Sequence, residues 1–128
     1  MLPTAIGLLA LLHGLIHLLY FGHSQRYFEL TEGFRWPENS WLLSPLTGVK
    51  TLLTAAGVLL LVSALLLGAS GAAYLFRQPW GDLALTAGAL WSSLTYLVLW
   101  DGKGRRLPDQ GLIGILINLV LLAYAMLN

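Results

Sequence analysis

Cysteine is absent from the 128-residue chain, which excludes disulfides, thiolate metal sites and cysteine catalysis. Charge is also scarce: charged residues make up 10% of the sequence, against about 25% in a typical soluble domain. So few charges cannot cover a water-facing surface, whereas 57% of the residues are hydrophobic. The net charge of +1 argues against nucleic acid as a partner. The composition therefore indicates an integral membrane protein.

Four stretches are long and apolar enough to cross the bilayer, which takes about 20 residues. They cover residues 3–22, 45–68, 80–100 and 111–127. No lysine or arginine precedes the first stretch, so we interpret it as a retained helix rather than a signal peptide. No segment alternates as a strand does, and the short second and third loops favour antiparallel neighbours. The sequence therefore predicts an all-α, up-and-down bundle of four transmembrane helices in a single domain.

Lysine and arginine are distributed unevenly among the predicted loops. The first and third loops, with their flanks, carry six of these residues, whereas the second carries only Arg77. Basic residues are retained on the cytoplasmic side of a membrane. We therefore expect the first and third loops in the cytoplasm and both termini outside.

The first loop, residues 23–43, is the only long segment outside the predicted spans. Its aromatic and leucine residues fall at helical spacing, which predicts a short amphipathic helix in the membrane interface. Trp36 and Trp41 fit an interfacial aromatic belt, as do Trp80 and Trp100 at the ends of the third helix. The alternative is that this loop covers a cytoplasmic opening of the bundle as a lid.

Two histidines lie at membrane depth, where ionisable residues are costly and are candidates for function. Their spacing of four residues places them on one face of the first helix, one turn apart. The other predicted helices carry polar residues at comparable depth. We expect all of them to converge on a ligand-binding pocket in the cytoplasmic half of the bundle. The predicted pocket residues are His13, His17, Lys50, Ser92, Tyr96 and Asn118.

Several roles remain open for the histidine pair. Two histidines form half of a metal site. No carboxylate or cysteine lies in the core of a predicted span to complete it, since Asp82 stands in the first turn of the third helix, so no metal is predicted. Because His13 and His17 share a face, they cannot bind opposite sides of one haem, but either could be a single axial ligand. With Tyr96 and Asn118 they could also contact a quinone or relay protons. The structural alternative is that they bond to neighbouring helices and fix the packing.

A compact polar turn joins the third and fourth predicted helices. We interpret it as a solvated cytoplasmic connector whose charges set the topology. Alternatively, Arg105 and Arg106 bind an anionic lipid headgroup together with Lys50. The residues of this turn are Asp101, Lys103, Arg105, Arg106 and Asp109.

Small residues recur at four-residue spacing on three of the predicted helices. This pattern favours close helix packing, either within the chain or in a homodimer. The residues are Ala10 and Gly14, Ala84, Gly88 and Ser92, and Gly114 with Asn118 on the fourth helix.

Three segments are familiar as sequences: residues 13–21 read HGLIHLLYF, residues 100–103 read WDGK, and residues 109–118 read DQGLIGILIN. Together they resemble small four-helix membrane proteins of bacteria, and the general plan is similar to that of DoxX-like proteins. The resemblance implies the four-helix plan and a location in the bacterial inner membrane. It points to His17, Asp101 and Asn118, and it implies no activity.

The small size and the lack of a soluble domain favour a non-enzymatic role. The chain is then an accessory subunit of a larger membrane complex, or a binder of a hydrophobic small molecule or lipid. A redox subunit holding haem or quinone through His13 or His17 is one alternative. A small dimeric transporter is another, although no buried carboxylate is present to couple ions. An enzyme is the least supported class. Ser92 or Ser93 could act as a nucleophile with His17 as the base, but no motif places them together, and transmembrane serines more often bond to their own helix backbone.

Overall fold

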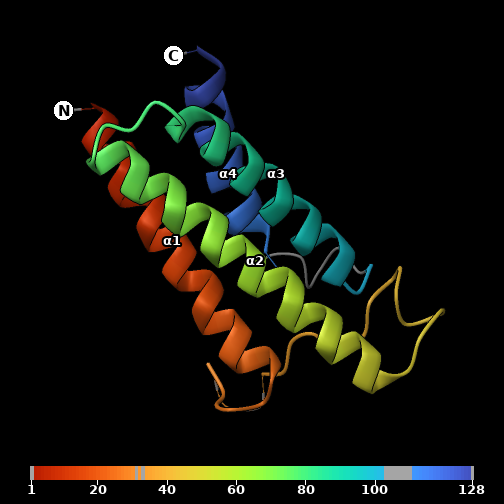
Figure 1. The fold of residues 1–128 in the computed structure, drawn as a ribbon. Coiled ribbons are helices and arrows are strands. Elements are labelled where there is room, and N and C mark those ends of the chain that lie inside the picture. The colour runs from red at the N-terminus through yellow and green to blue at the C-terminus, as the bar shows by residue number, and fades with distance from the viewer. Residues whose placement is uncertain (1, 31, 33, 103–110, 128) are drawn as a thin grey trace.

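The computed structural model describes residues 2–30, 32, 34–102 and 111–127. These residues form four helices, α1 (Leu2–Ser24), α2 (Val49–Leu75), α3 (Gly81–Leu99) and α4 (Leu112–Leu127). Successive helices run antiparallel, with α2 packed between α1 and α3 and with α4 against α3 (Figure 1). No strand occurs in this part of the chain. The predicted all-α, four-helix bundle is confirmed.

Three of the helices, α1 to α3, are long and apolar enough to cross a membrane, and α4 is a shorter apolar helix of 16 residues. Large aliphatic side chains point outward along all four helices, among them Leu12, Leu65, Leu83, Leu90 and Leu116. The buried positions, in contrast, include histidine, serine, threonine and asparagine side chains. Such an apolar exterior suits lipid rather than water. The fold is therefore that of a membrane protein.

The interior has two apolar clusters with polar side chains between them along the helices. One cluster contains Ile6, Leu67, Leu85 and Leu121, and it lies towards the two chain termini. The other contains Leu52, Leu60, Tyr96 and Leu99, with Trp36 of the first loop added to it. His13, His17, Ser92 and Asn118 lie between these clusters, so the polar layer is enclosed by apolar packing on both sides.

Glycine brings the backbones of α1 and α2 close together. A Cβ atom added at Gly71 would lie 2.7 Å from the Gly7 carbonyl oxygen, and one added at Gly14 would lie 3.2 Å from the Ala64 carbonyl oxygen. Gly14 belongs to the small-residue pattern expected on the first helix. Gly7 and Gly71 were not part of the predicted pattern. The close crossing of α1 and α2 therefore extends further towards the chain termini than the sequence pattern indicates.

The predicted bounds of the second helix, 45–68, are wrong at both ends. The chain around Pro45 forms turns, in which the Leu43 carbonyl accepts hydrogen bonds from the amides of Leu46 (2.9 Å) and Thr47 (2.8 Å). At the other end the helix passes Gly68 and ends at Leu75. In lipid the backbone has no water to bond with, so a glycine does not end a helix there as it does in water. The other helices agree with their predicted ranges within two residues.

The first loop does not form the predicted amphipathic helix: its described residues between 25 and 48 form turns and bends. Trp36 is 1% exposed and packs against the rings of Tyr20 and Tyr96, at centroid distances of 5.2 and 6.0 Å. The prediction of an interfacial role is therefore wrong for Trp36, whereas Trp41 and Trp80 are exposed. Trp36 thus packs over one end of the bundle, while the lid over a cytoplasmic opening stays a prediction.

Contacts with the last turns of α1 and α3 hold this loop in place. The Trp36 amide donates to His23 Nε2 (3.2 Å), and the Phe34 ring stacks on the His23 ring. The Trp41 amide donates to the Trp100 carbonyl (2.9 Å). These are contacts between distant segments, so tertiary packing outweighs the local helical spacing of the loop.

Candidate functional site

Five polar side chains from three helices meet in the middle of the bundle. His13 Nε2 lies 2.8 Å from Asn118 Oδ1, and His17 Nε2 lies 2.6 Å from Ser92 Oγ. Asn118 Nδ2 donates to Ser92 Oγ (2.9 Å) and to Ser93 Oγ (3.1 Å). The network thus joins α1, α3 and α4 through hydrogen bonds between side chains.

The backbone fixes the direction of every bond in this network. His17 Nδ1 lies 2.7 Å from the His13 carbonyl oxygen, which can only accept, so Nδ1 carries the hydrogen. A neutral imidazole has one N–H, so Nε2 accepts from the Ser92 hydroxyl. The Ser92 oxygen then accepts from the Asn118 amide, whose own oxygen accepts from His13 Nε2–H. A charged imidazolium would be costly at this depth, and the neutral pattern satisfies both ring nitrogens of His17.

One atom of this network lacks a partner. His13 is 1% exposed, and its second ring nitrogen, Nδ1, has no hydrogen-bond partner among the described residues. Because Nε2 carries the hydrogen, Nδ1 is an unsatisfied acceptor. Buried polar atoms are paired in the great majority of cases, so an exception of this kind points to a missing partner.

A cavity of about 250 Å³ lies beside His13, between α1 and α4. These two helices make few direct contacts with each other. The Tyr96 hydroxyl also has no hydrogen-bond partner among the residues that the structure describes. The cavity combines three aromatic rings with aliphatic walls. It is lined by His13, Ile16, Tyr20, Tyr96, Gly111, Ile113, Gly114 and Ile117.

The structure brings together five of the six predicted pocket residues. His13, His17, Ser92 and Asn118 share hydrogen bonds, and the Tyr96 ring lies 5.2 Å from the His17 ring. Lys50 does not join them. It is the second residue of α2 and is exposed, because a lysine near a helix end extends its ammonium group to the membrane surface.

The residues of the predicted polar turn, and one pocket residue that was not predicted, lie as follows. Asp101 is half-buried just after α3, whereas Lys103, Arg105, Arg106 and Asp109 lie outside the described residues. Sequence reasoning did not place Tyr20 in the pocket, although it lies three residues after His17 and therefore on the same helix face.

The residues present do not favour a metal or a haem. The described residues contain no group of three histidine, cysteine or carboxylate side chains close enough to hold a metal ion. An axial haem ligand needs a ring nitrogen free to bind iron, and both nitrogens of His17 are engaged. The cavity next to His13, at about 250 Å³, is too small to enclose a haem macrocycle. Small polar or aromatic head groups fit it better.

Comparison of the chain with protein-family models, curated proteins and solved structures found no match, so the resemblance to DoxX-like proteins stays a prediction.

Proposed function

We propose that the protein is a non-enzymatic membrane protein that binds a hydrophobic small molecule or lipid in the cavity between α1 and α4. The observation that carries this proposal is the unsatisfied Nδ1 atom of His13, a buried residue that lines the cavity. An unpaired buried acceptor costs about 1–3 kcal/mol, and a ligand that donates a hydrogen bond removes this cost. The ligand class is therefore an apolar molecule with a hydroxyl group.

The cavity walls support the same ligand class. The rings of Tyr20 and Tyr96 offer flat apolar surfaces, and the Tyr96 hydroxyl offers a second hydrogen bond. Ile113 and Ile117 belong to α4, which carries outward-facing apolar residues such as Leu116. A ring-bearing head group fits inside the cavity, while a hydrocarbon tail continues along the lipid-facing surface of the helices.

Replacing His13 by leucine is expected to reduce ligand retention about tenfold, because it removes the acceptor of a buried hydrogen bond. Native mass spectrometry of protein extracted gently from its host's membranes measures the retained mass. Tyr96→Phe removes one hydroxyl only and is also expected to reduce ligand retention. Lys50→Gln is the matched control, because Lys50 is a polar residue outside the cavity. Equal retention by wild type and both pocket variants would contradict the proposal.

A quinone-binding redox subunit is the second candidate. The imidazole of His13 and the phenol of Tyr96 line one cavity, and such groups bond to quinol hydroxyls or quinone carbonyls. The retained mass distinguishes this candidate from a lipid binder, because a quinone has its own mass and a redox-dependent absorbance.

We also propose that the chain lies in the bacterial inner membrane with the first and third loops in the cytoplasm. The excess of lysine and arginine in these loops supports this orientation. The cysteine-free chain allows a direct measurement with single cysteines at Asn39 and Gln78, both exposed. In intact cells an impermeant maleimide is expected to label Gln78→Cys and not Asn39→Cys. The reverse labelling would overturn the orientation.

A further inference from the structure

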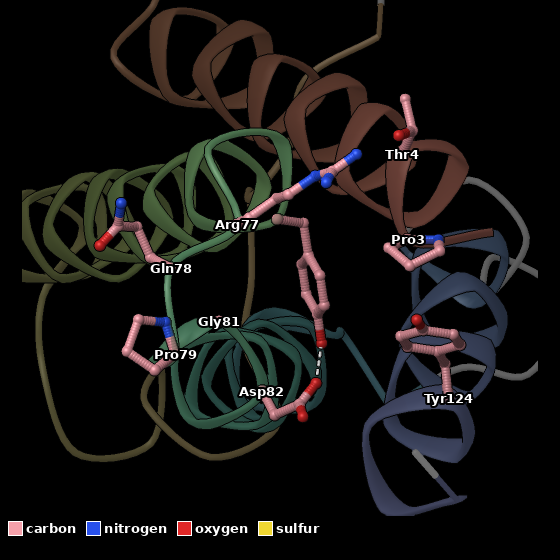
Figure 2. Close-up of a pocket in the computed structure, with 9 residues that line it drawn as sticks. Pro3, Thr4, Arg77, Gln78, Pro79, Gly81, Asp82 and Tyr124 are labelled. Atoms are coloured by element: carbon pink, nitrogen blue, oxygen red, sulfur yellow. Dashed lines mark hydrogen bonds between the residues drawn. The ribbon is translucent and has the colours of Figure 1, made fainter. Parts of the chain in front are cut away.

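A second cavity, of about 370 Å³, lies at the end of the bundle where α2 joins α3, far from the His13 cavity. Figure 2 shows residues of its walls, which come from different helices: Thr4 of α1, Asp82 of α3 and Tyr124 of α4. The side chain of Arg77, in the α2–α3 connection, extends across the opening towards α1. The ends of all four helices therefore meet around one polar space.

The two sides of this cavity differ in charge. On one side lies the guanidinium of Arg77, which has no hydrogen-bond or ion-pair partner among the described residues. On the other side the Tyr74 hydroxyl donates to the carboxylate of Asp82, and the Tyr74 and Tyr124 rings pack edge to face with their centroids 5.8 Å apart. A carboxylate beside aromatic rings attracts an ammonium group, while a guanidinium binds phosphate through two parallel hydrogen bonds.

The backbone places Arg77 at this position in an unusual conformation. Its φ of 55° lies in the left-handed region, which favours glycine or asparagine after a helix. The amides of Arg77 and Gln78 donate to the carbonyls of Tyr74 (3.2 Å) and Ala73 (2.8 Å), so this conformation closes the end of α2 and fixes where the Arg77 side chain starts. Because α2 ends at Leu75, the guanidinium can reach over the cavity mouth.

Exposed aromatic and aliphatic side chains surround the cavity. Phe76 and Leu83 are each 75% exposed, and Trp80 between them is exposed as well. Tryptophan and other large apolar side chains at the end of a transmembrane helix mark the interface between hydrocarbon and water. A ligand in this cavity is therefore in reach of the membrane lipids themselves.

We propose that this cavity binds the headgroup of a phospholipid that carries both a phosphate and a primary ammonium group. Arg77 binds the phosphate, and Asp82 with the rings of Tyr74 and Tyr124 binds the ammonium. The site is separate from the cavity of the proposed function and does not depend on it.

Lipid titration followed by native mass spectrometry tests the proposal, with delipidated full-length protein in detergent. The probes are phosphatidylethanolamine, with both groups, and phosphatidylglycerol, which lacks the ammonium. Wild type is expected to bind phosphatidylethanolamine about tenfold more tightly than phosphatidylglycerol. Arg77→Gln is expected to weaken this binding about tenfold, and Tyr124→Leu to reduce the preference for phosphatidylethanolamine, because Asp82 and Tyr74 remain. Tyr124→Phe keeps the ring and is expected to keep the preference.

Further variants and a competition experiment distinguish lipid binding at this site from misfolding and from binding of a soluble molecule. Arg77→Gly relieves the left-handed backbone and removes the side chain, so weak lipid binding by this variant cannot be ascribed to misfolding. Gly68→Ala, where an added Cβ atom meets nothing within 4 Å, is expected to bind phosphatidylethanolamine as wild type does. Equal binding of both lipids by wild type, or unchanged binding by both Arg77 variants, would overturn the proposal. Displacement of the lipid by millimolar phosphoethanolamine would assign the site to a soluble zwitterion instead.

Discussion

Replacing Gly71 by alanine is expected to destabilise the bundle by about 1–3 kcal/mol, the usual cost of overpacking an interior. The added methyl group would lie 2.7 Å from the Gly7 carbonyl oxygen and 3.0 Å from the Leu11 amide nitrogen. Both are backbone atoms of α1, so neither can move away without shifting the helix. The variant must therefore separate α1 from α2 at this crossing. Unfolding in mixed micelles with increasing dodecyl sulfate, followed by circular dichroism, measures the change.

Gly68 provides the matched control, one turn earlier in the same helix. A Cβ atom added there meets nothing within 4 Å. Gly68→Ala is expected to leave the stability unchanged or to raise it by up to about 1 kcal/mol, since alanine loses less backbone entropy in a helix. If both variants unfolded at the same dodecyl sulfate fraction as wild type, the close approach of α1 and α2 would not contribute to stability.

The number and type of the helices could be predicted because they depend on the composition of each stretch. Long apolar segments with few charges have one stable form in lipid, the hydrogen-bonded helix. The bounds of the second helix depend on more than composition. Pro45 and Gly68 suggest its ends, yet the helix starts at Val49 and continues to Leu75. Turn bonds around Leu43 delay the start, and packing of Gly71 against α1 favours continuation beyond Gly68.

The candidate site could be predicted in part because helical spacing and depth are properties of the sequence. The spacing of His13 and His17 places them on one face of their helix. Ser92 and Asn118 lie at a comparable depth in the membrane, which predicts contact with the two histidines. The sequence has no comparable signal for Trp36. This residue packs against Tyr20 and Tyr96, which line the cavity, because His23 bonds to its backbone across a loop, a contact between segments 13 residues apart. The missing partner of His13 Nδ1 also depends on the full three-dimensional network.

Replacing Asn118 by leucine, which has nearly the same shape, is expected to destabilise the protein by about 3–5 kcal/mol. Side-chain hydrogen bonds in membranes contribute on average about 0.6 kcal/mol each, and Asn118 makes three. The variant also leaves the Nε2–H of His13 buried without an acceptor, which adds about 1–3 kcal/mol. The same dodecyl sulfate titration measures the loss. Leu119→Ala, on the exposed face of α4, is the control and is expected to change stability by less than about 0.5 kcal/mol.

A double variant separates the hydrogen bond from general effects on packing. His13→Leu together with Asn118→Leu removes both the donor and its acceptor, so no N–H remains buried alone at this contact. The double variant is therefore expected to be more stable than the sum of the two single losses implies, by about 1 kcal/mol or more. Additive losses would mean that His13 and Asn118 act independently. Because α1 and α4 make few other direct contacts, coupling between these residues would identify their hydrogen bond as the main link across the cavity.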